Sequence, residues 1–145
     1  MSDYDITAAN SVFTITVPGL YNTPITLENY AADRAFETSM RDLAETSMSI
    51  DGYLSAGWIP TPVRQTISLA ASSESGLVFE AIAAAQDAQR GLYRLGAEIQ
   101  LPSIGRKYTM VRGLLQAVAV MPSAGRVLEG RSFEILWERV LPAAL

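Results

Sequence analysis

The feature that most restricts the fold of this chain is a regular alternation of apolar and polar residues in its second half. Between residues 93 and 101, one side of an extended chain carries Arg94, Glu98 and Gln100, and the other carries apolar residues (Tyr93, Leu95, Ala97, Ile99 and Leu101). A turn is predicted at residues 102–105, and residues 106–121 then continue as one extended stretch. At ~3.3 Å per residue this stretch is about 50 Å long, whereas a compact globule of this chain length is roughly 40 Å across. Long antiparallel strands are therefore expected to determine the architecture.

Shorter periodic segments predict further strands and a helix. The strands are expected at residues 12–17, 24–30, 63–71 and 133–140, with Phe133, Ile135 and Trp137 facing inward in the last of them. Pro18 and Gly19 predict the turn of a hairpin between the first two. The helix is expected to begin at Ser73 or Ser75 and to end at Gly91. Its apolar residues at helical spacing are Leu77, Val78, Ile82, Ala85 and Ala88.

The order of these elements predicts an α+β fold that is mainly antiparallel β, either a β-barrel or a sandwich with one helix. We expect a single domain over residues 1–145. Residues 31–62 are weakly periodic and exceed the ~12 to 15 residues of most unstructured connections, so they are predicted to form an extended loop or hairpin arm. Gly113 is expected to bend or bulge the long strand. The residues predicted for the core are Phe13, Ile15, Ile67, Leu69, Phe79, Ile82, Ile135 and Trp137.

The composition excludes most familiar enzyme chemistry. The chain has no histidine and no cysteine, which excludes Ser-His-Asp and Cys-His catalysis, Cys/His zinc sites and disulfides. Glu134 and Glu138 share a side of the last strand, but four residues of strand separate them by ~13 Å, too far for a glycosidase pair. The glycines near residues 52–57 form no phosphate-binding loop. We therefore expect no enzyme activity, no cofactor and no metal.

The charge is acidic and unevenly divided. The formal net charge is -4, and the first 51 residues carry 8 acids against 2 bases, so they hold -6 and the remainder holds +2. This sign argues against a protein that neutralises many phosphates of a nucleic acid. Either the acidic part is a solvated face, or acidic and basic ends of neighbouring subunits meet in a repeating assembly. No secretory signal and no apolar run long enough to span a membrane are expected.

The arrangement resembles the tail tube proteins of contractile-tailed bacteriophages and their relatives in secretion-system and pyocin-like particles. The resemblance lies in the hairpin at residues 11–30, the arm, and the strand and helix of residues 66–82, Thr-Ile-Ser-Leu-Ala-Ala-Ser-Ser-Glu-Ser-Gly-Leu-Val-Phe-Glu-Ala-Ile. It also lies in residues 128–140, Leu-Glu-Gly-Arg-Ser-Phe-Glu-Ile-Leu-Trp-Glu-Arg-Val. The resemblance implies a structural virion protein that forms stacked, hexameric rings through which DNA passes without specific binding.

The same resemblance implies the partners and the place of the protein. The partners would be further copies of the chain and the sheath, baseplate and terminator proteins, in a virion tail assembled in the host cytoplasm. Two alternatives stay open: a tube initiator or terminator ring protein, and a β-barrel that binds a small ligand.

Two groups of residues are candidates for the surfaces of such an assembly. The polar sides of two neighbouring strands are candidates for the face that lines the channel, namely Arg94, Glu98, Gln100, Glu134 and Glu138. The other reading of these residues is that they point outward, to a sheath or to solvent. The candidates for contacts between rings lie in the arm and are Asp42, Glu45, Tyr53 and Trp58.

Overall fold

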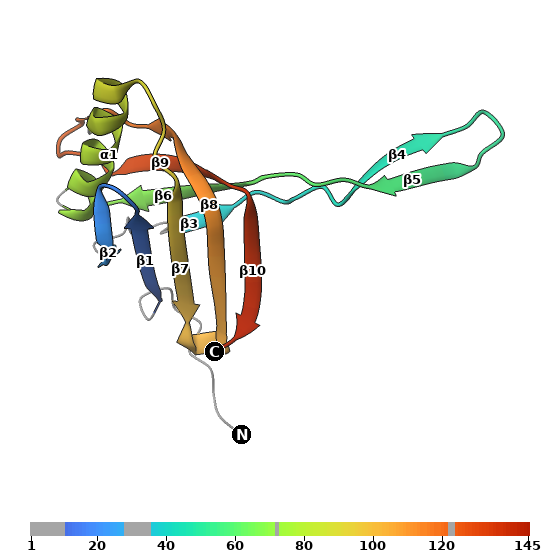
Figure 1. Cartoon of the computed structure of the whole chain (residues 1–145), viewed down its shortest axis with the longest axis horizontal. Coiled ribbons are helices and arrows are strands. Elements are labelled where there is room, and N and C mark those ends of the chain that lie inside the picture. The colour runs from blue at the N-terminus through green and yellow to red at the C-terminus, as the bar shows by residue number, and fades with distance from the viewer. Residues whose placement is uncertain (1–10, 28–35, 72, 122–123) are drawn as a thin grey trace.

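The chain forms a β-rich head from which a long two-stranded arm projects (Figure 1). The computed structural model describes residues 11–27, 36–71, 73–121 and 124–145. Its elements are β1 (Val12–Val17), β2 (Tyr21–Thr26), β3 (Phe36–Thr38), β4 (Ala44–Met48), β5 (Leu54–Trp58), β6 (Val63–Leu69), α1 (Ser75–Gln89), β7 (Leu95–Leu101), β8 (Arg106–Val118), β9 (Arg131–Trp137) and β10 (Arg139–Ala144), with a short 3-10 turn at Pro102–Ile104. The expectation of a mainly antiparallel β fold with a helix is confirmed.

The strands of the head form one antiparallel sheet that folds back on itself. Their order is β2-β1-β7-β8-β9-β6-β3, and β10 pairs with β8 off this path. The first part of β8 pairs with β10, and its second part pairs with β9. Two layers result, which we call the β7 layer (β2, β1, β7, β10 and the first part of β8) and the β6 layer (β9, β6, β3 and the second part of β8). Within the described residues β3 and β10 do not pair, so the sheet is a sandwich rather than a closed barrel.

The two layers meet at a corner in β8. Arg112 has a φ of 50°, a left-handed conformation that interrupts regular pairing. The neighbouring Gly113 is buried against the indole of Trp137, and a Cβ at this position would overlap the ring carbons. Glu138 lies between the end of β9 and the start of β10, opposite this corner. Its N–H donates to the carbonyl of Val111 at 3.2 Å. The predicted bend at Gly113 is confirmed.

The core lies between the layers and under the helix. All the residues predicted for it are buried. Phe79 of α1 stacks on Phe133 of β9 with ring centroids 4.5 Å apart, which fastens the helix to the sheet. The indole N–H of Trp137 donates to Oε1 of Gln65 at 2.9 Å inside this core. A polar group at this depth needs such a partner, because an unpaired one would cost the desolvation free energy.

The helix differs from its prediction in its packing and its ends. Leu77 is 60% exposed and Ala88 is also exposed, because the helix rests on the sheet through the narrow side that carries Phe79 and Ile82. Ser75 is the first helical residue, and its N–H donates to Oγ of Ser73. The helix ends at Gln89, with Arg90 following it in the left-handed conformation, so the end predicted at Gly91 was two residues too late.

Several strand limits also differ from the prediction. β8 ends at Val118 rather than at residue 121, and the last predicted strand is broken at Glu138 into β9 and β10. β2 begins at Tyr21, earlier than expected, and residues 28–30 of that prediction lie outside the described residues. Within the predicted arm, Phe36–Thr38 pairs with β6 and belongs to the head. The arm proper therefore starts after Thr38.

Candidate assembly surface

The arm is a two-stranded ribbon in a defined register. β4 and β5 pair antiparallel from Ala44 opposite Trp58 to Met48 opposite Leu54. The turn is closed by a hydrogen bond from the N–H of Gly52 to the carbonyl of Ser49 at 3.0 Å. Gly52 has a φ of 88°, a value that glycine adopts without strain. At the base, the hydroxyl of Thr61 donates to the carbonyl of Asp42 at 2.7 Å, which ties the two chains of the arm together.

The arm has one apolar side and one polar side. Residues paired across an antiparallel ladder share a side, so Ala44 and Trp58, Thr46 and Ala56, and Met48 and Leu54 lie together. The opposite side carries the pairs of Glu45 with Gly57 and of Ser47 with Ser55. In water an isolated two-stranded hairpin is marginally stable at best. Its apolar side therefore requires a covering surface.

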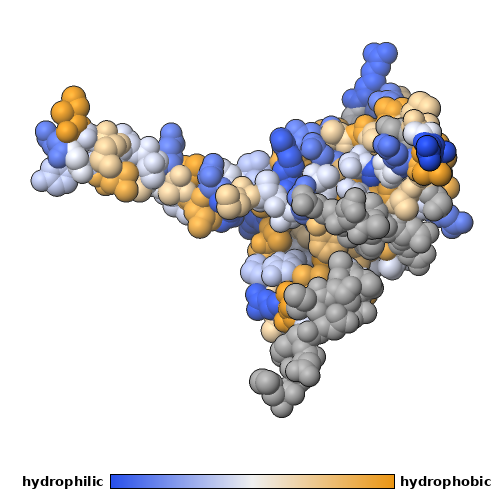
Figure 2. All heavy atoms as spheres, turned by 180° about the vertical axis from the view of Figure 1, so that it is seen from behind, coloured by the Kyte–Doolittle hydropathy of each residue, from blue (hydrophilic) through white to orange (hydrophobic). Residues whose placement is uncertain are grey.

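Nothing in the described part of the chain covers this apolar side. Every residue of β4 and β5 is exposed, and Trp58 is 72% exposed. Figure 2 shows hydrophobic residues along the arm and at its far end. The exposed large apolar residues of the arm are Met40, Leu43, Met48, Ile50, Tyr53, Leu54 and Trp58. Large exposed apolar side chains gathered on one segment in this way are typical of sites of interaction with another protein.

The four residues predicted for contacts between rings all lie on this arm and are exposed: Asp42, Glu45, Tyr53 and Trp58. Trp58 lies on the apolar side, and Glu45 lies on the polar side, opposite Gly57. Tyr53 belongs to the turn, where its N–H donates to Oγ of Ser49. The sequence-based candidates did not include the other exposed apolar residues of the arm, Met40, Leu43, Met48, Ile50 and Leu54, although the alternation of the arm carries the signal that would have found Met48 and Leu54.

The residues predicted to line a channel do not form one surface. β8 lies between β7 and β9, so the expectation that they come from neighbouring strands was wrong. Glu98 and Gln100 lie on the outer face of the β7 layer, where Nε2 of Gln100 donates to Oε1 of Glu98 at 3.1 Å. Glu134 lies on the outer face of the β6 layer, in register with Thr66.

The remaining two of these candidates, Arg94 and Glu138, line a shallow depression near the base of the arm together with Arg112. Glu138 forms an exposed ion pair there with Arg112, with Nε and Oε2 3.3 Å apart.

The described residues hold no cluster of acidic side chains that could bind a metal ion. In the same part of the chain, no helix is long and apolar enough to cross a membrane.

Solved structures share this fold over almost the whole chain. A chain of the anti-feeding prophage baseplate matches with a TM-score of 0.62 at 9% identity, over 99% of this chain and 98% of that one. A chain of the PVC sheath/tube terminator of an extracellular contractile injection system, in the extended state, matches with a TM-score of 0.62 at 12% identity, over 99% and 100%. A chain of the PVC sheath-tube complex matches with a TM-score of 0.61 at 12% identity, over 99% and 94%.

The chain thus shares its fold with components of contractile injection systems, the kind of particle to which the resemblance of its sequence pointed. The family model described as tail fiber protein gp32 matches residues 4–141. The chain belongs to this family. No curated protein matches the sequence.

Proposed function

We propose that this protein is a structural subunit of a contractile tail, and specifically that it forms rings that stack into the inner tube. The observation that carries the proposal is the arm, whose strands are wholly exposed although one of their sides is apolar. A soluble monomer has no use for such a ribbon, whereas a subunit in a ring or stack of rings covers it with its neighbours. The fold shared with a chain of a sheath-tube complex supports the same reading.

The arm is net negative, whereas residues 62–145, which form most of the head, hold nine bases and seven acids. Residues 39–61 hold three acids and one base, and the basic residues of the chain lie mostly in its second half. Contacts between the arm of one copy and the head of the next are then favourable and weakened by salt. The proposed partners are copies of this chain, followed by the sheath, baseplate and terminator proteins of a tail assembled in the host cytoplasm.

The proposed role is mechanical rather than catalytic. A hexameric ring would leave a channel through which DNA passes during ejection without specific binding. The net charge of -4 suits this role, because a wall that attracts phosphates strongly would hold the DNA back.

A second candidate function is that of a ring that ends the tube. The observation that favours it is the likeness in fold to a chain of a sheath/tube terminator, over 99% of this chain and 100% of that one. A terminator makes one or two rings and does not propagate, whereas a tube subunit stacks without a fixed limit.

Negative-stain imaging of the purified chain, with sedimentation velocity at the same concentrations, tests the proposal. Tubes of variable length are expected for a tube subunit. Single or double rings would favour the terminator. Monomers at all concentrations and at low salt would overturn both roles, because the arm would then have no partner among copies of the chain.

A further inference from the structure

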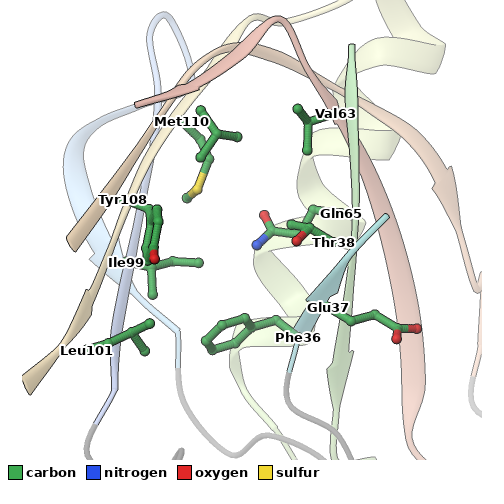
Figure 3. A pocket seen from close by; sticks show the side chains of 10 residues that line it. Phe36, Glu37, Thr38, Val63, Gln65, Ile99, Leu101, Tyr108 and Met110 are labelled. Atoms are coloured by element: carbon green, nitrogen blue, oxygen red, sulfur yellow. The ribbon is translucent and has the colours of Figure 1, made fainter. Parts of the chain in front are cut away.

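A pocket opens between the two layers of the head, at the edge where the sheet does not close. Its volume is about 390 Å³, and its walls are mostly apolar. One wall comes from β7 and β8, with Ile99, Tyr108 and Met110, and the other from β3 and β6, with Phe36 and Gln65 (Figure 3). An engineered apolar cavity of about 150 Å³ holds a benzene molecule, so this pocket has room for a large side chain and part of a second.

Among the described residues, the pocket holds a buried amide nitrogen without a hydrogen-bond partner. Gln65 is 1% exposed, and its Oε1 accepts the hydrogen bond from the indole of Trp137. Because an indole N–H can only donate, the other atom of the amide is the nitrogen, Nε2. Within the described residues Nε2 has no hydrogen-bond partner. Figure 3 shows this amide directed into the space between the layers, and a buried donor of this kind calls for an acceptor in the pocket.

The arm ends in a group that matches this pocket. The arm tip, residues 49–53, presents the fully exposed Ile50 and the exposed Tyr53. The turn uses the amides of Gly52 and Tyr53 in its own hydrogen bonds, while the carbonyls of Ile50 and Asp51 accept none from the described residues. The tip therefore offers both an apolar side chain and a hydrogen-bond acceptor.

The charges of the tip and of the pocket's surroundings are opposite. The tip carries Asp51. Arg106, at the start of β8, lies on the same side of that strand as the lining residues Tyr108 and Met110. The one acid among the lining residues, Glu37, points away from the pocket in Figure 3.

The tip of one copy cannot enter the pocket of the same copy. The pocket lies at the base of the arm, because β3 and β6, which flank the arm, form its wall. About 11 residues of extended chain separate the base from the tip, which places them ~36 Å apart. A head of roughly 100 residues is about 35 Å across, so the arm has the length needed to reach a neighbouring head.

We propose that this inter-sheet pocket is the docking site for the arm tip of a second copy of this chain, with Ile50 in the pocket and a tip carbonyl on Nε2 of Gln65. The inference rests on the proposed function and names the surface that receives the arm. Because the arm tip and the pocket are two different surfaces of the same subunit, their contact is heterologous. Such contacts generate closed rings or open helical assemblies.

Cross-linking tests the contact directly, because the chain has no cysteine of its own. Ile50→Cys protein is mixed with Thr38→Cys protein, whose new thiol is exposed on a residue that lines the pocket, and the mixture is oxidised. Disulfide-linked heterodimer is expected to exceed that of an Ile50→Cys and Leu92→Cys mixture by about two orders of magnitude, because docking raises the effective thiol concentration. Leu92 is exposed on the head outside the pocket. Equal yields in the two mixtures would overturn the inference.

A second pair of variants separates this inference from the proposed function. Ile50→Asp removes the apolar side chain that would enter the pocket, and Val140→Trp fills the pocket. Each protein alone is expected to be monomeric, because it lacks either a working tip or a working pocket. Their mixture is expected to stop at heterodimers, because only the tip of the Val140→Trp protein and the pocket of the Ile50→Asp protein can still join. If the Ile50→Asp protein assembled like the wild type, the proposal that the pocket receives the arm tip would be overturned, while the proposed role in a tail would stand. Absence of any assembly by the wild-type protein would overturn the proposed function and the docking together.

Discussion

At the scale of single residues, the corner of the sheet depends on the close contact between Gly113 and Trp137. A methyl group at position 113 would overlap the indole ring carbons, and the indole is held by its bond to Gln65. Gly113→Ala is therefore expected to destabilise the fold by about 1 to 3 kcal/mol, the usual range for overpacking a core. Urea denaturation measures this change. Gly96→Ala in β7 is the matched control, because nothing lies within 4 Å of a Cβ there. An equal effect of both substitutions would contradict the assigned cause.

The two ion pairs of the described residues offer a second comparison. Arg131 is buried, donates from Nη1 to Glu80, and lies over the ring of Phe133 at 5.4 Å from its centroid. Both members of the other pair, Arg112 and Glu138, are largely exposed. Glu80→Ala should cost about 1 to 3 kcal/mol, because it leaves a buried guanidinium unpaired, although the exposure of the Glu80 carboxylate brings the value toward the low end.

Glu138→Ala should change the free energy of unfolding by less than about 1 kcal/mol, since exposed pairs contribute little. The same urea titrations compare the two variants. A larger loss from Glu138→Ala than from Glu80→Ala would show that the exposed pair at the corner, and not the buried one under the helix, supports the fold.

At the scale of elements, the arm is the part of the molecule whose sequence makes sense only in an assembly. Asp42 and Glu45 are exposed, and within the described residues neither carboxylate forms a hydrogen bond or an ion pair. Asp42→Lys with Glu45→Lys is expected to shorten the tubes without unfolding the subunit, because the acidic arm would then meet a basic neighbour as a like charge. Tube lengths in negative stain and a thermal unfolding curve measure the two effects.

The matched control for this double variant is Glu74→Lys with Asp87→Lys, which makes the same change of charge at exposed positions near or on α1. If the arm and control variants gave tubes of the same length, Asp42 and Glu45 would have no part in the contact between rings.

The strands of the head could be predicted because the alternation of β1, β6, β7 and β9 reports directly which side chains are buried. The break at Glu138 could not, since it arises from Arg112 and Gly113 on another strand, where the sheet turns its corner. The spacing of Leu77 predicted that it packs against the sheet, but it is exposed. Helical spacing shows which residues share a side of the helix, and it does not show how much of that side the sheet covers. The residues suggested for the ring contacts share the arm, but the pocket with Gln65 required the three-dimensional arrangement, because its walls come from four separate strands and β10.

At the scale of the whole molecule, the sandwich has two outer faces, and one of them at most can line a channel. Glu98 lies on the outer face of the β7 layer among hydroxyl side chains, in register with Thr14 and Thr109. Glu134 lies on the outer face of the β6 layer, next to the strand that carries Arg64. The part of the β7-layer face formed by β1 and β7 carries hydroxyls and one carboxylate and repels phosphate weakly. The cations of the same face, Lys107 and Arg139, lie on β8 and β10, and a cation repeated in every ring would attract phosphate. We therefore expect the β1 and β7 part of the β7 layer to face the channel, with the edge that carries Lys107 and Arg139 turned away from it.

Labelling of cysteines in assembled tubes tests this orientation. Glu98→Cys and Glu134→Cys proteins are assembled and treated with a polymer-linked maleimide too large to enter the channel. Glu98→Cys should be protected in tubes and labelled in dissociated subunits, since its thiol would face the enclosed bore. Glu134→Cys should be labelled in both states, because its face would point toward the sheath side. Protection of position 134 with labelling of position 98 would reverse the orientation, and it would place Arg64 and the acidic Glu37 along the path of the DNA instead of the threonine-rich face.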